Sequence, residues 1–138
     1  MDPESEQLYK QYCNDPHGKI YERWKYKGYE VIIGKTKFCL VAYIQLPENH
    51  PLIGKDYDSV NTMLEKLPHG GFTYSDSYLS LDRSGSTWFL GWDYGHYYDA
   101  TFTDIDVSGK RVWRIEEISE EAREIVDELE KYWKKVQS

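Results

Sequence analysis

An apolar stripe near the C-terminus is the strongest constraint on how this chain folds. Its members recur every three or four residues: Ala122, Ile125, Val126, Leu129, Trp133 and Val136. This spacing is typical of one face of an α-helix, and such a face must be buried against a partner surface. Glutamates at the start of the segment and lysines at its end suit the helix dipole, and we expect Ser119 to cap the helix. We expect the stripe to pack on a sheet of the same chain, with docking into a partner protein as the alternative.

Short segments upstream predict that sheet. Trp88, Leu90 and Trp92 share one face of a strand over residues 87–92. Further strands are predicted over residues 29–33, 37–45, 72–81 and 110–115, and a strand or an irregular arm over residues 20–29. Turns are predicted at residues 34–36 and 82–85, loops at 46–55 and 93–109, and short helices at 3–13 and 58–67. The predicted class is α+β: a mostly antiparallel sheet of about five strands, with the C-terminal helix on one face and a short N-terminal helix.

Length and composition predict a single domain. The chain has 138 residues, of which 40% are hydrophobic and 30% charged, which excludes intrinsic disorder as the main state. It divides into an N-terminal helix and linker (1–18), a sheet with site loops (19–115) and the C-terminal helix (116–138). No apolar run is long enough to cross a membrane, the acidic N-terminus does not resemble a secretory signal, and Cys13 and Cys39 lack metal-ligand spacing. These features favour a reduced, cytoplasmic protein without a membrane partner.

The charge balance argues against general nucleic-acid binding. The chain has 17 basic and 24 acidic residues, a formal charge of −7, whereas binding to phosphates needs a basic surface. The charges are unevenly placed, because residues 19–37 hold six lysines and arginines while residues 48–106 hold ten acids against three bases. The first region suits a small anionic ligand. The second, acidic region could bind a cation. It could instead repel nucleic acid, or imitate the surface of a nucleic acid.

Three loop segments carry polar residues suited to chemistry. The first contains His50, which precedes a proline that restricts the loop backbone. The second, over residues 69–75, reads H-G-G-F-T-Y-S, and its paired glycines let backbone amides approach an anion or adopt positive φ. The third, over residues 88–99, reads W-F-L-G-W-D-Y-G-H-Y-Y-D. For the first two, the alternative is a histidine that only braces its loop.

The third segment places Asp93, His96 and Asp99 three residues apart. On a helical turn this spacing would bring two carboxylates and an imidazole together, a set that suits a divalent cation or an acid–base pair. Glycines in the segment argue against a regular helix, so the alternative is that Asp93 orients His96 and both brace the loop. The sequence contains no motif that marks a catalytic nucleophile.

Together these segments resemble a family of small uncharacterised bacteriophage and prophage proteins. The shared motifs are H-P-x-x-G-K-x-Y at residues 50–57, H-G-G-x-T-Y-S at 69–75 and W-x-x-G-[FW]-D-x-x-H-x-x-D at 88–99, preceded by C-L-V-A-Y at 39–43. The resemblance covers about residues 38–130 and implies a phage protein acting in the cytoplasm of a bacterial host. The chain departs from the family pattern at Leu40, Trp92, Gly95 and Tyr98, and the last places a bulky ring beside Asp99.

The resemblance and the three segments together predict one shared site. Its predicted ligand-binding residues are His50, His69, Gly70, Gly71, Thr73, Tyr74, Asp93, His96 and Asp99. The candidates for catalysis are His69, His96 and Asp93, and the candidate metal ligands are Asp93, His96 and Asp99. No cofactor is predicted beyond such a divalent ion.

Three functions compete at the level of sequence. The first is an accessory protein that acts against host defence by binding and sequestering a small nucleotide-like ligand. The second is an acidic inhibitor of a host nuclease or CRISPR effector. The third is a histidine- or metal-dependent phosphodiesterase that acts on a nucleotide signal. The sequence leaves oligomer formation open.

Overall fold

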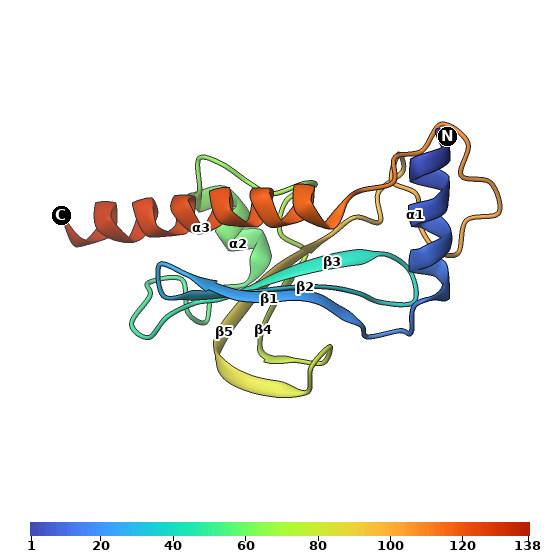
Figure 1. Ribbon diagram of the computed structural model, residues 1–138. Coiled ribbons are helices and arrows are strands. Elements are labelled where there is room, and N and C mark those ends of the chain that lie inside the picture. The colour runs from blue at the N-terminus through green and yellow to red at the C-terminus, as the bar shows by residue number, and fades with distance from the viewer.

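Five antiparallel strands form one sheet, with helices on one face and at one end (Figure 1). The computed structural model describes residues 1–138, apart from the side chain of Ser86. Its elements are α1 (Pro3–Asn14), β1 (Ile20–Tyr26), β2 (Tyr29–Lys35), β3 (Leu40–Gln45), α2 (Tyr57–Met63), β4 (Tyr74–Leu79), β5 (Ser84–Asp93) and α3 (Ile115–Gln137). The strands follow the order β1-β2-β3-β5-β4 across the sheet, and every neighbouring pair is antiparallel. The predicted α+β class is confirmed.

The first three strands form two consecutive hairpins. Lys27 and Gly28 join β1 to β2 with positive φ angles of 53° and 85°, as a two-residue turn requires. The predicted turn at residues 34–36 is wrong, because β2 continues through Gly34 and Lys35. A Cβ atom on Gly34 would lie 2.6 Å from the carbonyl oxygen of Lys19. Glycine is therefore needed here for close approach to the chain before β1, and not for a turn.

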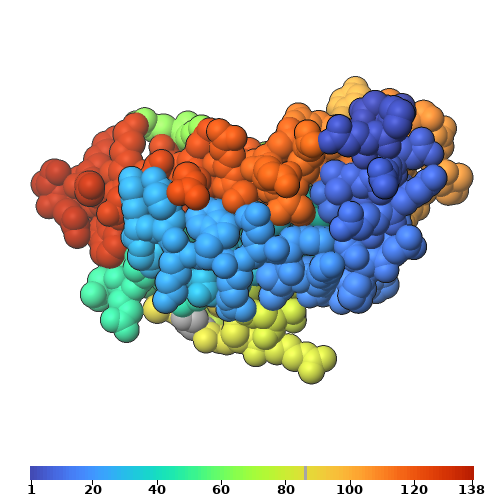
Figure 2. Space-filling model, in the orientation of Figure 1, coloured from blue at the N-terminus to red at the C-terminus, as the bar shows by residue number. Residues whose placement is uncertain are grey.

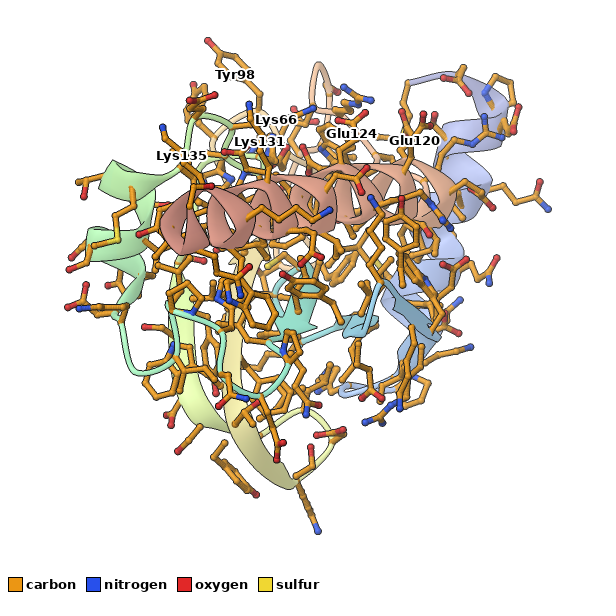
Figure 3. All side chains as sticks on the ribbon, turned by 90° about the vertical axis from the view of Figure 1, so that its left-hand side faces the viewer. Lys66, Tyr98, Glu120, Glu124, Lys131 and Lys135 are labelled. Atoms are coloured by element: carbon orange, nitrogen blue, oxygen red, sulfur yellow. The ribbon has the colours of Figure 1, made fainter. Side chains whose placement is uncertain are left out.

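The helix α3 covers one face of the sheet, as Figures 1 and 2 show. Ala122, Ile125, Val126 and Leu129 are fully buried against residues of β2, β3 and β5. The outer face of α3 is charged, and Figure 3 shows Glu124 and Lys131 on it, near Lys66. The predicted packing of the apolar stripe on the chain's own sheet is thus confirmed as far as Leu129, whereas Val136 at the end of the stripe is exposed. The opposite face of the sheet holds a smaller core around Ile32, Tyr43 and Phe89.

The segment between β5 and α3 returns along the sheet end without forming a strand. The predicted strand over residues 110–115 is wrong, since its only ladder contact among the described residues is a single bridge between Asp99 and Arg111. The predicted cap at Ser119 is also wrong, because α3 begins at Ile115. The Glu117 carboxylate accepts a hydrogen bond from the Arg114 amide at 3.0 Å, which satisfies the backbone one turn earlier than expected.

The short helix α1 stands at the end of the sheet, beside the segment that leads to α3 (Figures 1 and 2). Lys35, only 1% exposed, donates from Nζ to the carbonyl oxygens of Tyr12 at 2.5 Å and Asp15 at 2.9 Å. A cation at this position suits the negative end of the helix dipole. Lys35 therefore anchors α1 and does not belong to a surface for small anions. Within the described part of the chain, no helix is long and apolar enough to cross a membrane.

Candidate functional site

A buried carboxylate, Asp99, is the centre of the candidate site. Its side chain is in contact with three rings from three parts of the chain. Its Oδ2 atom accepts from His69 Nε2 at 2.8 Å, from the His96 amide at 2.9 Å and from His96 Nδ1 at 3.2 Å. Its Oδ1 atom accepts from Trp113 Nε1 at 2.8 Å. Burial alone would raise the pKa of Asp99, but the hydrogen bonds that it accepts outweigh burial and lower this pKa below its usual value of 3.8.

This carboxylate fixes how the two histidines carry their protons. An ionised carboxylate only accepts hydrogen bonds, so His69 must donate from Nε2 and His96 from Nδ1. In the neutral imidazoles, His69 Nδ1 and His96 Nε2 then hold the lone pairs. The side chains of the two histidines remain 26% and 38% exposed, whereas that of Asp99 is 4% exposed. The site thus presents two oriented imidazoles at the surface above a buried charge.

His69 is held by a wall of aromatic rings. It is stacked on Tyr94 with 4.9 Å between centroids and 5° between planes, and its centroid lies 4.9 Å from that of Trp113. Tyr94 follows β5 on the same side as Trp92, whose Nε1 donates to the Tyr94 hydroxyl at 3.0 Å. Burial raises the pKa of Tyr94, which keeps its hydroxyl protonated as a donor to the Glu121 carboxylate on α3. The sheet and α3 therefore position His69 together.

His96 is positioned by a glycine in the 68–71 turn. Gly70 has a φ of 72°, and a Cβ atom there would lie 2.3 Å from both Cε1 and Nε2 of His96. The imidazole of His96 thus packs directly on the backbone that carries His69, and the two rings meet edge to face at 5.0 Å. Only glycine allows this approach.

The structure brings His69, His96 and Asp99 together but gives Asp93 another place. Asp93 accepts from Thr73 Oγ1 at 2.8 Å and from the Gly95 amide at 3.0 Å. Its Oδ1 atom lies 4.0 Å from His96 Nδ1, farther than Asp99 Oδ2. The interpretation that Asp93 orients His96 is therefore wrong, because Asp99 holds this ring.

His50 lies elsewhere, and the prediction that it shares one cleft with the other histidines is wrong. It is 3% exposed and packs edge to face on Tyr29 and against Trp133. Its Nδ1 accepts from the Leu52 amide at 3.1 Å, so Nε2 carries the proton and donates to the carbonyl oxygen of Leu129 at 3.2 Å. Burial lowers the pKa of His50 from its usual 6.5, which favours the neutral form. His50 braces its loop against α3.

Two further predicted contacts are not at the cluster. Tyr74 lies on the opposite face of the sheet, edge to face with Tyr43 at 5.2 Å. The Gly71 amide donates to the carbonyl oxygen of Pro68 at 2.8 Å, so it is not free to bind an anion. Tyr74 begins β4 opposite Gly91, on the face of β5 that also carries Phe89, and this pairing places its ring opposite the helix-covered face.

Sequence reasoning missed Trp113 and Tyr94 as parts of the site. Trp113 falls within the strand predicted over residues 110–115, which gives its indole no role at a site. It instead donates to Asp99, and the Arg111 guanidinium stacks 3.5 Å above its ring. The signal that could have found Tyr94 is its place two residues beyond Trp92, where the alternation of the strand continues onto the same buried side.

The cluster has the donors for two kinds of chemistry. One ligand atom from each of His69, His96 and Asp99 lies within 4.8 Å of the others, which is the spacing of a metal-binding group. Two imidazoles on one carboxylate also form an acid–base pair. No protein-family model matches this chain, and neither a curated protein nor a solved structure does.

Proposed function

We propose that this chain binds a small nucleotide-like ligand at the His69–His96–Asp99 cluster and thereby sequesters it. The observation that supports the proposal is the arrangement of two partly exposed imidazoles on one buried carboxylate. Burying a charge is costly unless its hydrogen bonds are satisfied, and all four at Asp99 serve to orient rings and the loop that carries them. Such fixed, polar rings at a surface are suited to ligand recognition.

Neighbouring side chains suit the two parts of a nucleotide. Tyr97 and Tyr98 follow His96 directly and are 79% and 74% exposed, with their rings edge to face. Figure 3 shows Tyr98 extending into solvent beyond α3. Exposed rings stack on bases. Lys110, with Nζ 5.8 Å from the Tyr97 ring, and Arg111 lie on the same side, but each is paired with a carboxylate, Lys110 with Asp104 and Arg111 with Glu117. A phosphate would share these cations with the two carboxylates.

The resemblance to phage proteins suggests the setting of this function. In an infected bacterium, a protein that sequesters a nucleotide-like signal would lower its free concentration and so act against host defence. This role requires tight binding and no turnover. It also accommodates the acidic charge of the chain, because a small ligand needs only a local cationic surface.

A ligand-dependent thermal shift tests the proposal. The untagged full chain is heated with nucleoside mono-, di- and triphosphates and with cyclic dinucleotides, each with and without divalent ions. A ligand at 100 times its Kd should stabilise the fold by about 2.7 kcal/mol. The shift should vanish in His69→Gln and persist in the control His17→Gln, since His17 is exposed and has no part in the cluster. A shift that survives His69→Gln would contradict the proposed site.

Recovery of the ligand after denaturation separates the alternatives. Intact ligand supports sequestration. Altered ligand would instead support the phosphodiesterase, with His69 and His96 as the acid and base on either side of a phosphodiester. A panel without any shift, combined with a stable complex with a host nuclease or CRISPR effector, would support the inhibitor.

A further inference from the structure

The charges around the two histidines favour a cation as the first occupant of the site. Asp99 lies beneath both rings, Asp93 lies 4.0 Å from His96, and Glu121 is bonded to the tyrosine that stacks on His69. The Arg111 guanidinium next to this wall is paired with Glu117. With neutral imidazoles, the cluster therefore carries more negative than positive charge. This negative charge would repel a phosphate that arrives without a counter-ion, whereas it would attract a divalent cation.

We infer that His69, His96 and Asp99 bind a divalent transition metal, with Zn²⁺ as the ion of best fit. Zinc takes imidazole nitrogen and carboxylate oxygen at about 2.0–2.2 Å, so ligand atoms around a tetrahedral ion lie about 3.4 Å apart. Asp99 Oδ2 lies 2.8 Å from His69 Nε2 and 3.2 Å from His96 Nδ1. To reach this spacing, the carboxylate oxygen would move about 0.6 Å from His69 Nε2 and about 0.2 Å from His96 Nδ1, and the three ligand atoms already lie within 4.8 Å of one another.

Metal binding at these nitrogens requires each histidine to carry its proton on the other ring nitrogen. In the metal-free protein the protons lie on His69 Nε2 and His96 Nδ1, the nitrogens that face Asp99. When the ion binds these nitrogens, each neutral imidazole carries its proton on the opposite ring nitrogen, and no net proton is released. The ion then replaces two hydrogen bonds to Asp99 Oδ2 with two coordination bonds to the rings and one to the carboxylate.

The surrounding contacts resemble those that support metal ligands. Trp113 Nε1 donates to Asp99 Oδ1, the oxygen that the ion would leave free, and so keeps the carboxylate turned toward the histidines. Tyr94 fixes the plane of His69, and Gly70 lets His96 pack directly on the turn that carries His69. His50 does not offer a ligand to such an ion, because both of its ring nitrogens are bonded to backbone groups and the ring is buried.

Three protein ligands leave a tetrahedral ion one open position. This step rests on the proposed function: a phosphate oxygen of the nucleotide-like ligand would take the open position. The ion would thus link an acidic protein to an anionic ligand. The base of the ligand would then lie toward the exposed rings of Tyr97 and Tyr98.

Titration calorimetry with zinc chloride tests the metal site. The full chain is used without a histidine tag and with Cys13→Ser, because Cys13 is an exposed free thiol that also binds zinc. We expect one ion per chain, with affinity reduced at least tenfold in each of His69→Gln, His96→Gln and Asp99→Asn. His17→Gln is the matched control and should stay within about threefold of the parent, since His17 does not belong to the ligand set. Absence of binding, or binding that His69→Gln and His96→Gln leave unchanged, overturns the inference.

A variant that fails to fold does not leave the test open. Circular dichroism identifies such a variant, and Gly70→Ala then serves in its place, because its methyl group displaces His96 while all three ligands remain. The nucleotide panel is repeated with a chelator to separate the two proposals. Zinc binding without any nucleotide shift supports the metal site and contradicts the proposed function. A nucleotide shift that persists in chelator supports the function and contradicts the role of the ion as the link between protein and ligand.

Discussion

Two histidine environments lie toward opposite ends of α3 and show how a partner decides what an imidazole does. His50 contacts the C-terminal half of the helix at Leu129 and Trp133, and its partners are backbone groups. His69 and His96 lie near the start of the helix, and their shared partner is a carboxylate. Backbone partners permit full burial of a neutral ring. A buried carboxylate keeps two rings oriented at the surface, where they remain available to a ligand.

The largest effect on stability is expected from the strand that supports the second environment. Trp92 is 1% exposed and donates to Tyr94 behind His69. Trp92→Ala should cost about 3–5 kcal/mol of unfolding free energy, because it empties a core position. Urea denaturation measures this cost, and ligand binding should be lost with the fold. A variant of wild-type stability would mean that the ring contributes little to the core.

The next largest effect concerns the carboxylate itself. Asp99→Asn presents an amide to groups that donate, so we expect a loss of about 2 kcal/mol. Asp93→Asn is the matched control, since Asp93 is partly exposed and makes two hydrogen bonds. Its cost should stay below about 1 kcal/mol. Equal costs for the two variants would show that Asp99 is not the centre of the cluster.

The buried histidine should make stability depend on pH. The folded-state pKa of His50 lies below its unfolded value of about 6.5, so the unfolded chain takes up the proton first. This contribution is complete above pH 6.5 and is lost as the pH falls below it, with a slope that approaches about 1.4 kcal/mol per pH unit. Urea denaturation of the wild type and of His50→Gln at pH 7.5, 6.5 and 5.5 should show a smaller slope in the variant. Parallel slopes would contradict a neutral, buried His50.

Much of this fold was predictable because the spacing of apolar residues in the sequence matches the residues that the structure buries. The alternation at residues 87–92 and the stripe of α3 each select one buried face, and the structure buries both. The errors arose where a distant group decides. Lys35 extends β2 because α1 supplies carbonyl acceptors for it, and Trp113 leaves the predicted strand for a carboxylate 14 residues away.

The site was predictable in its residue types but not in its pairing. Equal spacing made Asp93 and Asp99 equivalent partners for His96 in the sequence. The turn at residues 96–99 selects Asp99, because the Asp99 amide donates to the carbonyl oxygen of His96 at 2.9 Å and closes the turn. Thr73 and the Gly95 amide bind Asp93 instead. His50 shares its loop character with His69, and only the tertiary structure buries it.

A pair of glycine variants separates backbone strain from the positioning of His96. Gly70 and Gly71 both have positive φ, so alanine at either should cost about 1–2 kcal/mol through strain alone. A Cβ on Gly71 would meet Asn61 at 3.4 Å, whereas one on Gly70 would overlap His96. Binding of zinc or nucleotide should therefore fall in Gly70→Ala and persist in Gly71→Ala. Equal losses would show that the position of the His96 ring does not matter.

The most direct test of the account is a paired measurement on His96→Ala. The ring is partly exposed, and the amide that holds Asp99 remains, so the unfolding free energy should fall by only about 1 kcal/mol, the cost of one hydrogen bond to the carboxylate. Binding of the ligand that shifts the wild type should be abolished. A folded His96→Ala protein without binding is the result that the account predicts. Full binding would remove His96 from the site, and failure to fold would show that this histidine is a structural brace like His50.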